Sequence, residues 1–144
     1  KREIVSNGIL NEWTLDLASS RKLDMKPTAN AARGVSSNPS PTNWNIELSS
    51  REDLHDNLLK EMGTGLLVTS LIGSTINANT GDYSRGASGF WVEDGQICYP
   101  VSEITIAGNL RDMLKGIILG NDAKKHLSYV VPSILVESMT LAGS

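Results

Sequence analysis

The dipeptide Asp94-Gly95 constrains the fold of this chain more than any other feature. It stands between the apolar triplets FWV and ICY. Asp-Gly in this setting predicts a β-hairpin, because both central residues of a type I′ turn need positive φ. If these two residues form the turn, the side chains predicted to face each other are Val92 and Ile97, Phe90 and Tyr99, and Trp91 and Cys98.

The stretch before this hairpin, residues 81–89 (GDYSRGASG), is predicted to be a glycine-rich loop. Its glycines let the backbone approach a ligand closely, and its hydroxyls, phenol and guanidinium offer hydrogen bonds, so a binding loop is one interpretation. The alternative is a turn whose Arg85 is a solvated charge. The candidate binding residues of this stretch are Asp82, Tyr83, Ser84, Arg85 and Gly86.

Other turn and helix signals divide the rest of the chain. Asn7-Gly8 predicts a first hairpin within residues 3–17, with residues 4–5 on one arm and 9–17 on the other, and a short helical turn is expected over residues 16–23. Ser49 and Glu52 form a capping box that predicts a helix ending at Gly63. Asn109 is expected to cap another helix that contains Gly116 and ends at Gly120.

Apolar runs predict the strands. Residues 44–48 alternate, whereas residues 65–72 (GLLVTSLI) are almost continuously apolar, which predicts burial on both faces. Pro100 predicts a bend or an edge in the strand 99–106, and residues 128–142 are expected to form one or two strands broken at Pro132. The fold class is therefore α+β and mainly β, with antiparallel sheets forming a barrel or sandwich and two or three peripheral helices.

Residues 25–43 are rich in Pro, Gly, Ser, Asn and Thr and are predicted to form a long loop. A loop of this length is either functional or disordered, and composition leaves both alternatives open.

The two histidines of the sequence do not have the spacing of a catalytic metal site. A zinc hydrolase needs about three protein ligands, commonly with two histidines one helical turn apart. The chain has only His55 and His126, which are predicted to lie on the surface. No G-x-S-x-G nucleophile motif is present, since Ser88 has the wrong spacing from the glycines around it.

Charge and cysteine content limit the class of protein. A net charge of −3 argues against a basic nucleic-acid surface, so no direct nucleic-acid partner is expected. One cysteine, Cys98, fits a reducing cytoplasm and is expected to be a small cross-strand apolar residue. No apolar run approaches the ~20 residues that a membrane helix needs, so no membrane partner is expected.

The run GDYSRGASGFWVEDGQICYPVSEITIAGNLRDML closely resembles the C-terminal region of the PmbA/TldE branch of the TldD/PmbA family, once called modulators of DNA gyrase. The supporting segments are residues 7–10 (NGIL), 20–23 (SRKL), 61–66 (EMGTGL) and 120–122 (GND). The resemblance spans nearly all of the chain. It implies that residues 1–144 are the C-terminal domain of a longer protein whose N-terminal region is absent here.

The resemblance also implies a function. In the TldD branch, a histidine–glutamate helix in an earlier region and a cysteine near the C-terminus bind the catalytic metal, and residues 126–136 contain no cysteine. The chain is thus expected to be the subunit without metal ligands in a heteromeric peptidase, with zinc in a TldD-like partner. The implied substrates are small peptides and unfolded polypeptides, including peptide-antibiotic precursors and antitoxins. The resemblance places the 25–43 loop beside the peptide-binding cleft, with Arg33, Thr42 and Asn43 as candidates.

The alternative hypothesis belongs to another class of protein. The domain would then be a binding or assembly module without proteolytic activity, acting as a homo-oligomer such as a homodimer. Cleavage of an unfolded peptide by the full-length protein mixed with a histidine–glutamate-bearing partner distinguishes the two hypotheses.

Overall fold

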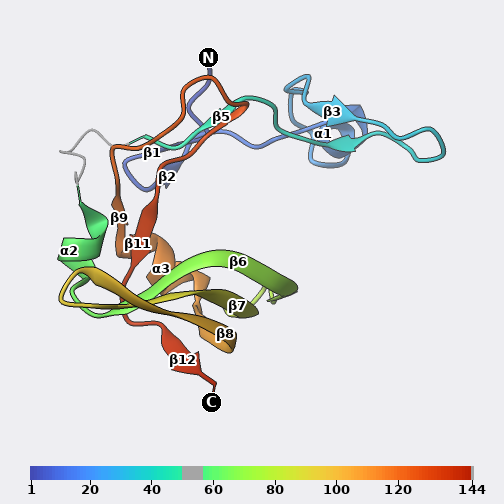
Figure 1. The fold of residues 1–144 in the computed structure, drawn as a ribbon. Helices are drawn as coiled ribbons and strands as arrows, with labels where there is room; N and C mark the ends of the chain where they lie inside the picture. Colours follow the sequence, from blue (N-terminus) through green and yellow to red (C-terminus); the bar gives the residue numbers. More distant parts are fainter. Residues whose placement is uncertain (50–56, 144) are drawn as a thin grey trace. The chain divides into compact units, whose positions relative to one another are not determined.

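The computed structural model describes residues 1–49 and 57–143, which are mainly β-strand with short helices (Figure 1). Two compact units divide the chain. The first contains Lys1–Glu47 and His126–Val130, and the second contains Leu48–Lys125 and Val131–Ser144. None of the helices in the described part of the chain is long and apolar enough to cross a membrane.

The first unit opens with the predicted hairpin. Strands β1 (Val5–Ser6) and β2 (Ile9–Leu10) pair antiparallel around Asn7 and Gly8, whose φ angles of 50° and 74° are those of a type I′ turn. Helix α1 (Leu17–Lys22) follows, and the backbone N–H of Ser19 donates to the Asp16 carboxylate at 2.7 Å. The turn and the short helix are therefore confirmed, although the hairpin is shorter than predicted.

Residues 25–43 contain a small ribbon that was not predicted. Strands β3 (Ala31–Ala32) and β4 (Ser40–Pro41) pair antiparallel within this segment. Strand β5 (Ile46–Glu47) then pairs in parallel with β10 (Tyr129–Val130), which is distant in the sequence.

The second unit is built on a four-stranded antiparallel sheet in the order β12-β8-β7-β6. Strands β6 (Gly65–Ile76), β7 (Asp82–Glu93) and β8 (Gln96–Asn109) are long, and β12 (Thr140–Ala142) covers only residues 105–107 of β8. Pro100 lies in the half of β8 that β12 does not cover, which confirms the predicted local edge.

The segment 81–89, predicted to be a loop, is instead the first half of β7. Each of its residues from Asp82 onward belongs to a strand that has a neighbour on both sides, β6 and β8. The prediction was wrong because glycines in this segment serve strand packing. At Gly89, an added Cβ would lie 1.9 Å from the Leu67 carbonyl oxygen, so only glycine fits there without a backbone shift.

The hairpin turn is confirmed, but the register beyond it is only partly as predicted. Asp94 and Gly95 have φ of 50° and 73°, and Val92 faces Ile97. Cys98 is an extra residue in a β-bulge, which shifts the pairing by one position. As a result, the predicted pairs Phe90 with Tyr99 and Trp91 with Cys98 are wrong, and the observed pairs are Phe90 with Pro100 and Trp91 with Tyr99.

Strand β6 lies at the edge of the sheet, so its predicted burial on both faces is wrong. Val68, Leu71 and Ile72 are 37%, 39% and 69% exposed. The strand also carries bulges between Val68 and Ser70 and between Ile72 and Thr75. A continuous apolar run predicts a strand, but it does not predict whether that strand lies in the middle or at the edge of the sheet.

The second and third predicted helices are found at α2 and α3. Helix α2 (Leu58–Met62) begins after Asn57, whose side chain accepts from the Lys60 N–H, and ends at Gly63 as predicted. Glu52, the second residue of the predicted capping box, lies outside the described residues. His55 does so as well. Helix α3 (Leu110–Lys115) is capped by Asn109, as predicted.

Gly116 is the C-cap of α3, so its predicted place inside a longer helix is wrong. The residues after it form β9 (Ile117–Leu119), which pairs antiparallel with β11 (Ile134–Val136). Tertiary pairing with β11 thus overrides the helical spacing of the apolar residues. The region 128–142 holds three strands, β10, β11 and β12, with Pro132 between the first two.

The mainly β class with antiparallel sheets is confirmed. Four of the described sheets are antiparallel, and the large one is open, not a closed barrel. The buried apolar side chains of the second unit include Val92, which is 0% exposed, and Ile106 and Leu135 at 6% and 8%. Val92 belongs to β7, so the middle of the sheet is its most protected part.

Candidate functional site

The second unit contains an open hollow with a volume of about 980 Å³. Its walls come from α2, β6, β11 and the segments after β9 and β11, with single residues from β7, β8, β12 and α3. Most of the lining is apolar, including Leu58, Met62, Leu66, Val68, Leu71, Ile106, Met113, Leu135, Met139 and Leu141. A concave apolar surface of this size is typical of a site that binds a ligand or a peptide.

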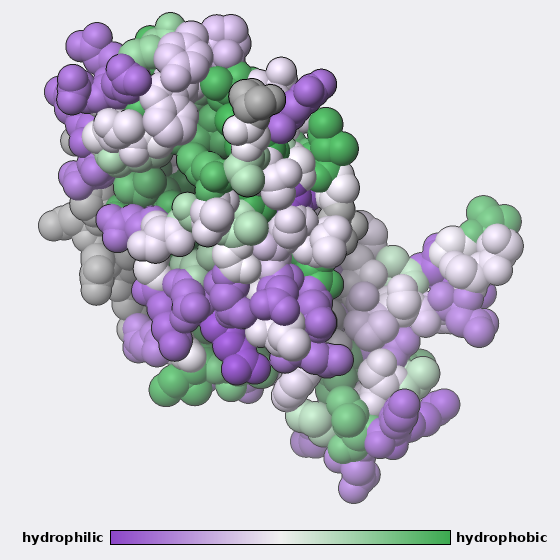
Figure 2. Space-filling model, turned by 90° about the horizontal axis from the view of Figure 1, so that it is seen from below, coloured by the Kyte–Doolittle hydropathy of each residue, from purple (hydrophilic) through white to green (hydrophobic). Residues whose placement is uncertain are grey.

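Polar residues occupy part of the lining, and the charged ones are all acidic. Glu61, Asp122 and Glu137 line the hollow, whereas no Lys or Arg is among its described lining residues. Figure 2 shows apolar side chains gathered in patches between hydrophilic ones on one face of the molecule. The hollow therefore combines an apolar wall with negative charge.

Asp122 is held in place by Ser133. The Ser133 N–H donates to Oδ1 at 2.7 Å, and its hydroxyl donates to Oδ2 at 2.6 Å. The hydroxyl and backbone hydrogen bonds from Ser133 hold the pKa of the Asp122 carboxyl below its usual value. Asp122 is consequently an ionised group near neutral pH. Asp122 belongs to the short segment 120–122 (GND), which the sequence analysis used only for the family resemblance.

The candidates from the predicted binding loop do not converge on one point. Tyr83 lines the hollow. Arg85 donates from Nε to the Gly73 carbonyl oxygen at 2.7 Å and so braces the bulge of β6. Asp82 accepts a hydrogen bond from the Thr80 hydroxyl at 2.6 Å. Ser84 and Gly86 are strand residues paired with Ala107 and Thr105 of β8.

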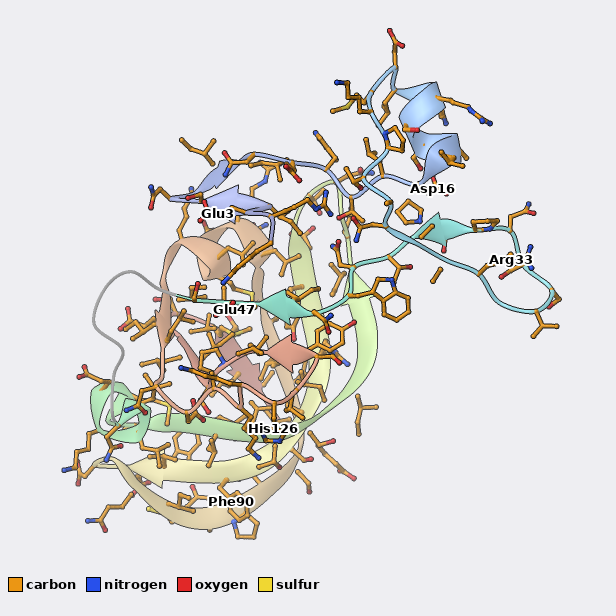
Figure 3. The ribbon with its side chains drawn as sticks, turned by 90° about the horizontal axis from the view of Figure 1, so that it is seen from above. Glu3, Asp16, Arg33, Glu47, Phe90 and His126 are labelled. Atoms are coloured by element: carbon orange, nitrogen blue, oxygen red, sulfur yellow. The ribbon has the colours of Figure 1, made fainter. Side chains whose placement is uncertain are left out.

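The candidates from the 25–43 segment belong to the first unit. Arg33 is exposed just after β3 (Figure 3). Thr42 donates its N–H to the Asn30 carbonyl oxygen at 3.2 Å, and the Asn43 side chain accepts from the Thr14 hydroxyl at 2.8 Å. Thr42 and Asn43 therefore attach the segment to its own unit by hydrogen bonds, whereas Arg33 is exposed.

The described residues do not fit a zinc centre. His126 is exposed, and within residues 1–49 and 57–143 no three His, Cys, Asp or Glu side chains come together as a ligand set. Cys98 is exposed at its bulge, with Sγ 3.5 Å from the Gln96 carbonyl oxygen, so its predicted role as a packed cross-strand residue is wrong.

Comparison with known proteins extends the resemblance to defined relatives. The family model described as PmbA/TldA metallopeptidase C-terminal domain matches residues 1–143. Metalloprotease PmbA of Escherichia coli O157:H7 is 48% identical over 144 residues, covering 99% of this chain and 30% of that protein. The Haemophilus influenzae homologue is 47% identical with the same coverage. The chain thus spans about a third of the length of these curated relatives.

Solved structures agree with the sequence matches. A proposed modulator of DNA gyrase from Thermotoga maritima has a TM-score of 0.73 and 36% identity, covering 96% of this chain and 32% of that one. A protein of the same description from Bacteroides thetaiotaomicron has a TM-score of 0.74 and 28% identity, covering 99% and 30%. The chain therefore belongs to the family of PmbA/TldA metallopeptidase C-terminal domains.

Proposed function

We propose that this domain belongs to the subunit without metal ligands in a peptidase that acts on small peptides and unfolded polypeptides. The observation that carries the proposal is the apolar hollow of the second unit, which offers an extended chain a concave surface. Family membership supports a role in proteolysis, since the relatives are named metalloproteases. In this proposal the active site forms only with a partner.

The partner in this proposal is a TldD-like subunit that supplies zinc through its own histidines and glutamate. The domain would contribute the wall of a reaction chamber and hold an unfolded substrate extended, so that backbone hydrogen bonds give affinity without strong sequence choice. Such a complex would act in the cytoplasm.

The proposal is tested by reconstitution. The full-length protein and a TldD-like partner are purified separately and mixed, and cleavage of an unfolded casein-type peptide and bound zinc are measured. We expect cleavage only in the mixture and zinc only with the partner. Stoichiometric zinc or cleavage in the isolated protein would contradict the proposal. A homo-oligomer that forms no complex and supports no cleavage would favour the assembly module.

Arg33 and Arg85 provide matched variants for this assay. Arg33 is exposed, so Arg33→Ala is expected to lower turnover or subunit affinity with an unchanged melting temperature. Arg85→Ala removes the donor to the Gly73 carbonyl oxygen. It is therefore expected to lower the free energy of unfolding as well, by about 1 kcal/mol. An unchanged turnover in both variants would remove these arginines from the site.

A further inference from the structure

We infer that the hollow of the second unit binds apolar peptide segments that carry positive charge and discriminates against acidic ones. The inference rests on the proposed function, because it specifies the class of substrate that the chamber would accept.

The first step is the apolar wall. Leu71, Ile134 and Leu141 line the hollow and remain 39%, 42% and 39% exposed. Apolar side chains exposed together on a concave surface mark a binding site for a ligand or another chain. The volume of about 980 Å³ lies at the upper end of the roughly 300–1,000 Å³ typical of small-molecule pockets, which suits a short stretch of peptide.

The second step is the charge of the lining. Glu61, Asp122 and Glu137 are its charged members, and no described lining residue is basic. Asp122 keeps both carboxylate oxygens within 2.7 Å of Ser133 donors, so its negative charge is fixed in position. Lys124 does not line the hollow but is close enough to attract this carboxylate, so Glu61 and Glu137 are the acids that the variants test. The three acids come from α2, the segment after β9 and the segment after β11, so different parts of the wall carry negative charge.

The third step is the chemistry of the occupant. An acidic segment would meet like charges next to an apolar wall, which opposes binding. A Lys or Arg side chain can instead lay its methylene stem on apolar surface and place its charged end near a carboxylate. Charge complementarity therefore selects a segment with both apolar and basic residues.

The experiment compares two labelled unfolded peptides of equal length and equal apolar content, one carrying Lys and the other Glu at the same positions. Binding to the full-length protein is measured by fluorescence anisotropy. We expect the Lys peptide to bind about tenfold more tightly at about 50 mM salt and the preference to shrink at about 500 mM, because salt screens the charges. Equal binding of the two peptides would overturn the inference.

Variants assign the preference to the hollow. The double variant Glu61→Gln with Glu137→Gln keeps side-chain size and should reduce the preference to about twofold, with its fold checked by circular dichroism. Glu103→Gln is the control, because Glu103 is an exposed residue of β8 that does not line the hollow. A double variant that is folded and keeps the full preference would contradict the inference.

Cleavage by the mixture with the TldD-like partner is measured in parallel with both peptides. Charge preference in binding without cleavage would reject the proposed function and leave the inference standing. Cleavage without any charge preference in binding would support the proposed function and reject the inference about charge.

Discussion

At the level of single residues, a few positions have roles that depend on one contact. Gly89 is needed because β6 passes close to its Cα, and Arg85 supplies a donor to a carbonyl exposed by a bulge. Both residues stand in a segment whose composition resembles that of a loop. Gly89 allows the close approach of β6, and Arg85 donates a hydrogen bond to β6. These contacts within the sheet explain why a glycine and an arginine occur inside a long strand.

Substituting Gly89 tests the close approach of the strands. Gly89→Ala would place a Cβ 1.9 Å from the Leu67 carbonyl oxygen, so we expect a loss of about 3 kcal/mol in the free energy of unfolding. The matched control is Gly86→Ala, where the nearest atom to the new Cβ is the Ile72 Cβ at an ordinary 3.5 Å. Urea titrations of both variants give the comparison, and equal losses would show that the contact at Gly89 is not limiting.

The Asp122 carboxylate makes a pH-dependent contribution to stability. Hydrogen bonds from Ser133 lower its pKa in the folded state, so its contribution is complete above the unfolded pKa of about 3.9 and is lost as pH falls through the folded value. Asp122→Asn should therefore be less stable than the natural protein at pH 7, and the difference should shrink below about pH 4.

Urea titrations at pH 7 and pH 3 measure this difference. Ser133→Ala removes one of the two donors and should be non-additive with Asp122→Asn, because both substitutions break the same pair. A difference that is constant with pH would show that the ionised form of Asp122 is not the one that Ser133 stabilises.

At the scale of secondary-structure elements, extra residues in the outer strands shape the sheet. Strand β7 is the common partner, whereas β6 and β8 carry the additional residues at their bulges, among them Thr69 and Cys98. Bulges increase the local twist and disturb the unpaired edge of β6. The same insertions move Cys98 out of the predicted cross-strand position.

The Asn109 side chain links the start of α3 to the turn before β7, and substitution tests both contacts. Its Oδ1 accepts from the Arg111 N–H, which caps α3, and its Nδ2 donates to the Thr80 carbonyl oxygen, both at 3.0 Å. Asn109→Ala should cost about 2 kcal/mol because both bonds are lost. Asn109→Asp keeps the capping acceptor and should cost less when both are measured by thermal unfolding. Equal losses would assign the stability to the Thr80 contact alone.

At the scale of the whole molecule, the two units differ in how they are held together. The second unit has the large sheet, whereas the first is assembled from strands of two residues and one short helix. Hydrogen exchange is therefore expected to be slowest in β7, which is paired on both sides, and fast in residues 25–43.

Val92 is the residue on which the second unit is expected to depend most. Its side chain is 0% exposed, so Val92→Ala should lower the free energy of unfolding by about 2 kcal/mol. Val68→Ala on the edge strand, where the side chain is 37% exposed, should cost less than about 1 kcal/mol. Urea unfolding followed by tryptophan fluorescence compares them, and a larger loss at Val68 would show that the edge strand is buried in solution.

The local features of this protein could be predicted from its residues alone. The turns at Asn7-Gly8 and Asp94-Gly95 and the cap at Asn109 follow from φ preferences and from hydrogen bonds within a few residues. The mainly β class and the family also follow from the sequence.

Three features depend on contacts between distant parts of the chain. Residues 82–89 form a strand, α3 ends at Lys115, and Glu61, Asp122 and Glu137 line one hollow. Each of these depends on partners distant in the chain. Strand pairing, bulge position and the convergence of side chains are set by the packing free energy of whole elements, which no local pattern of residues specifies.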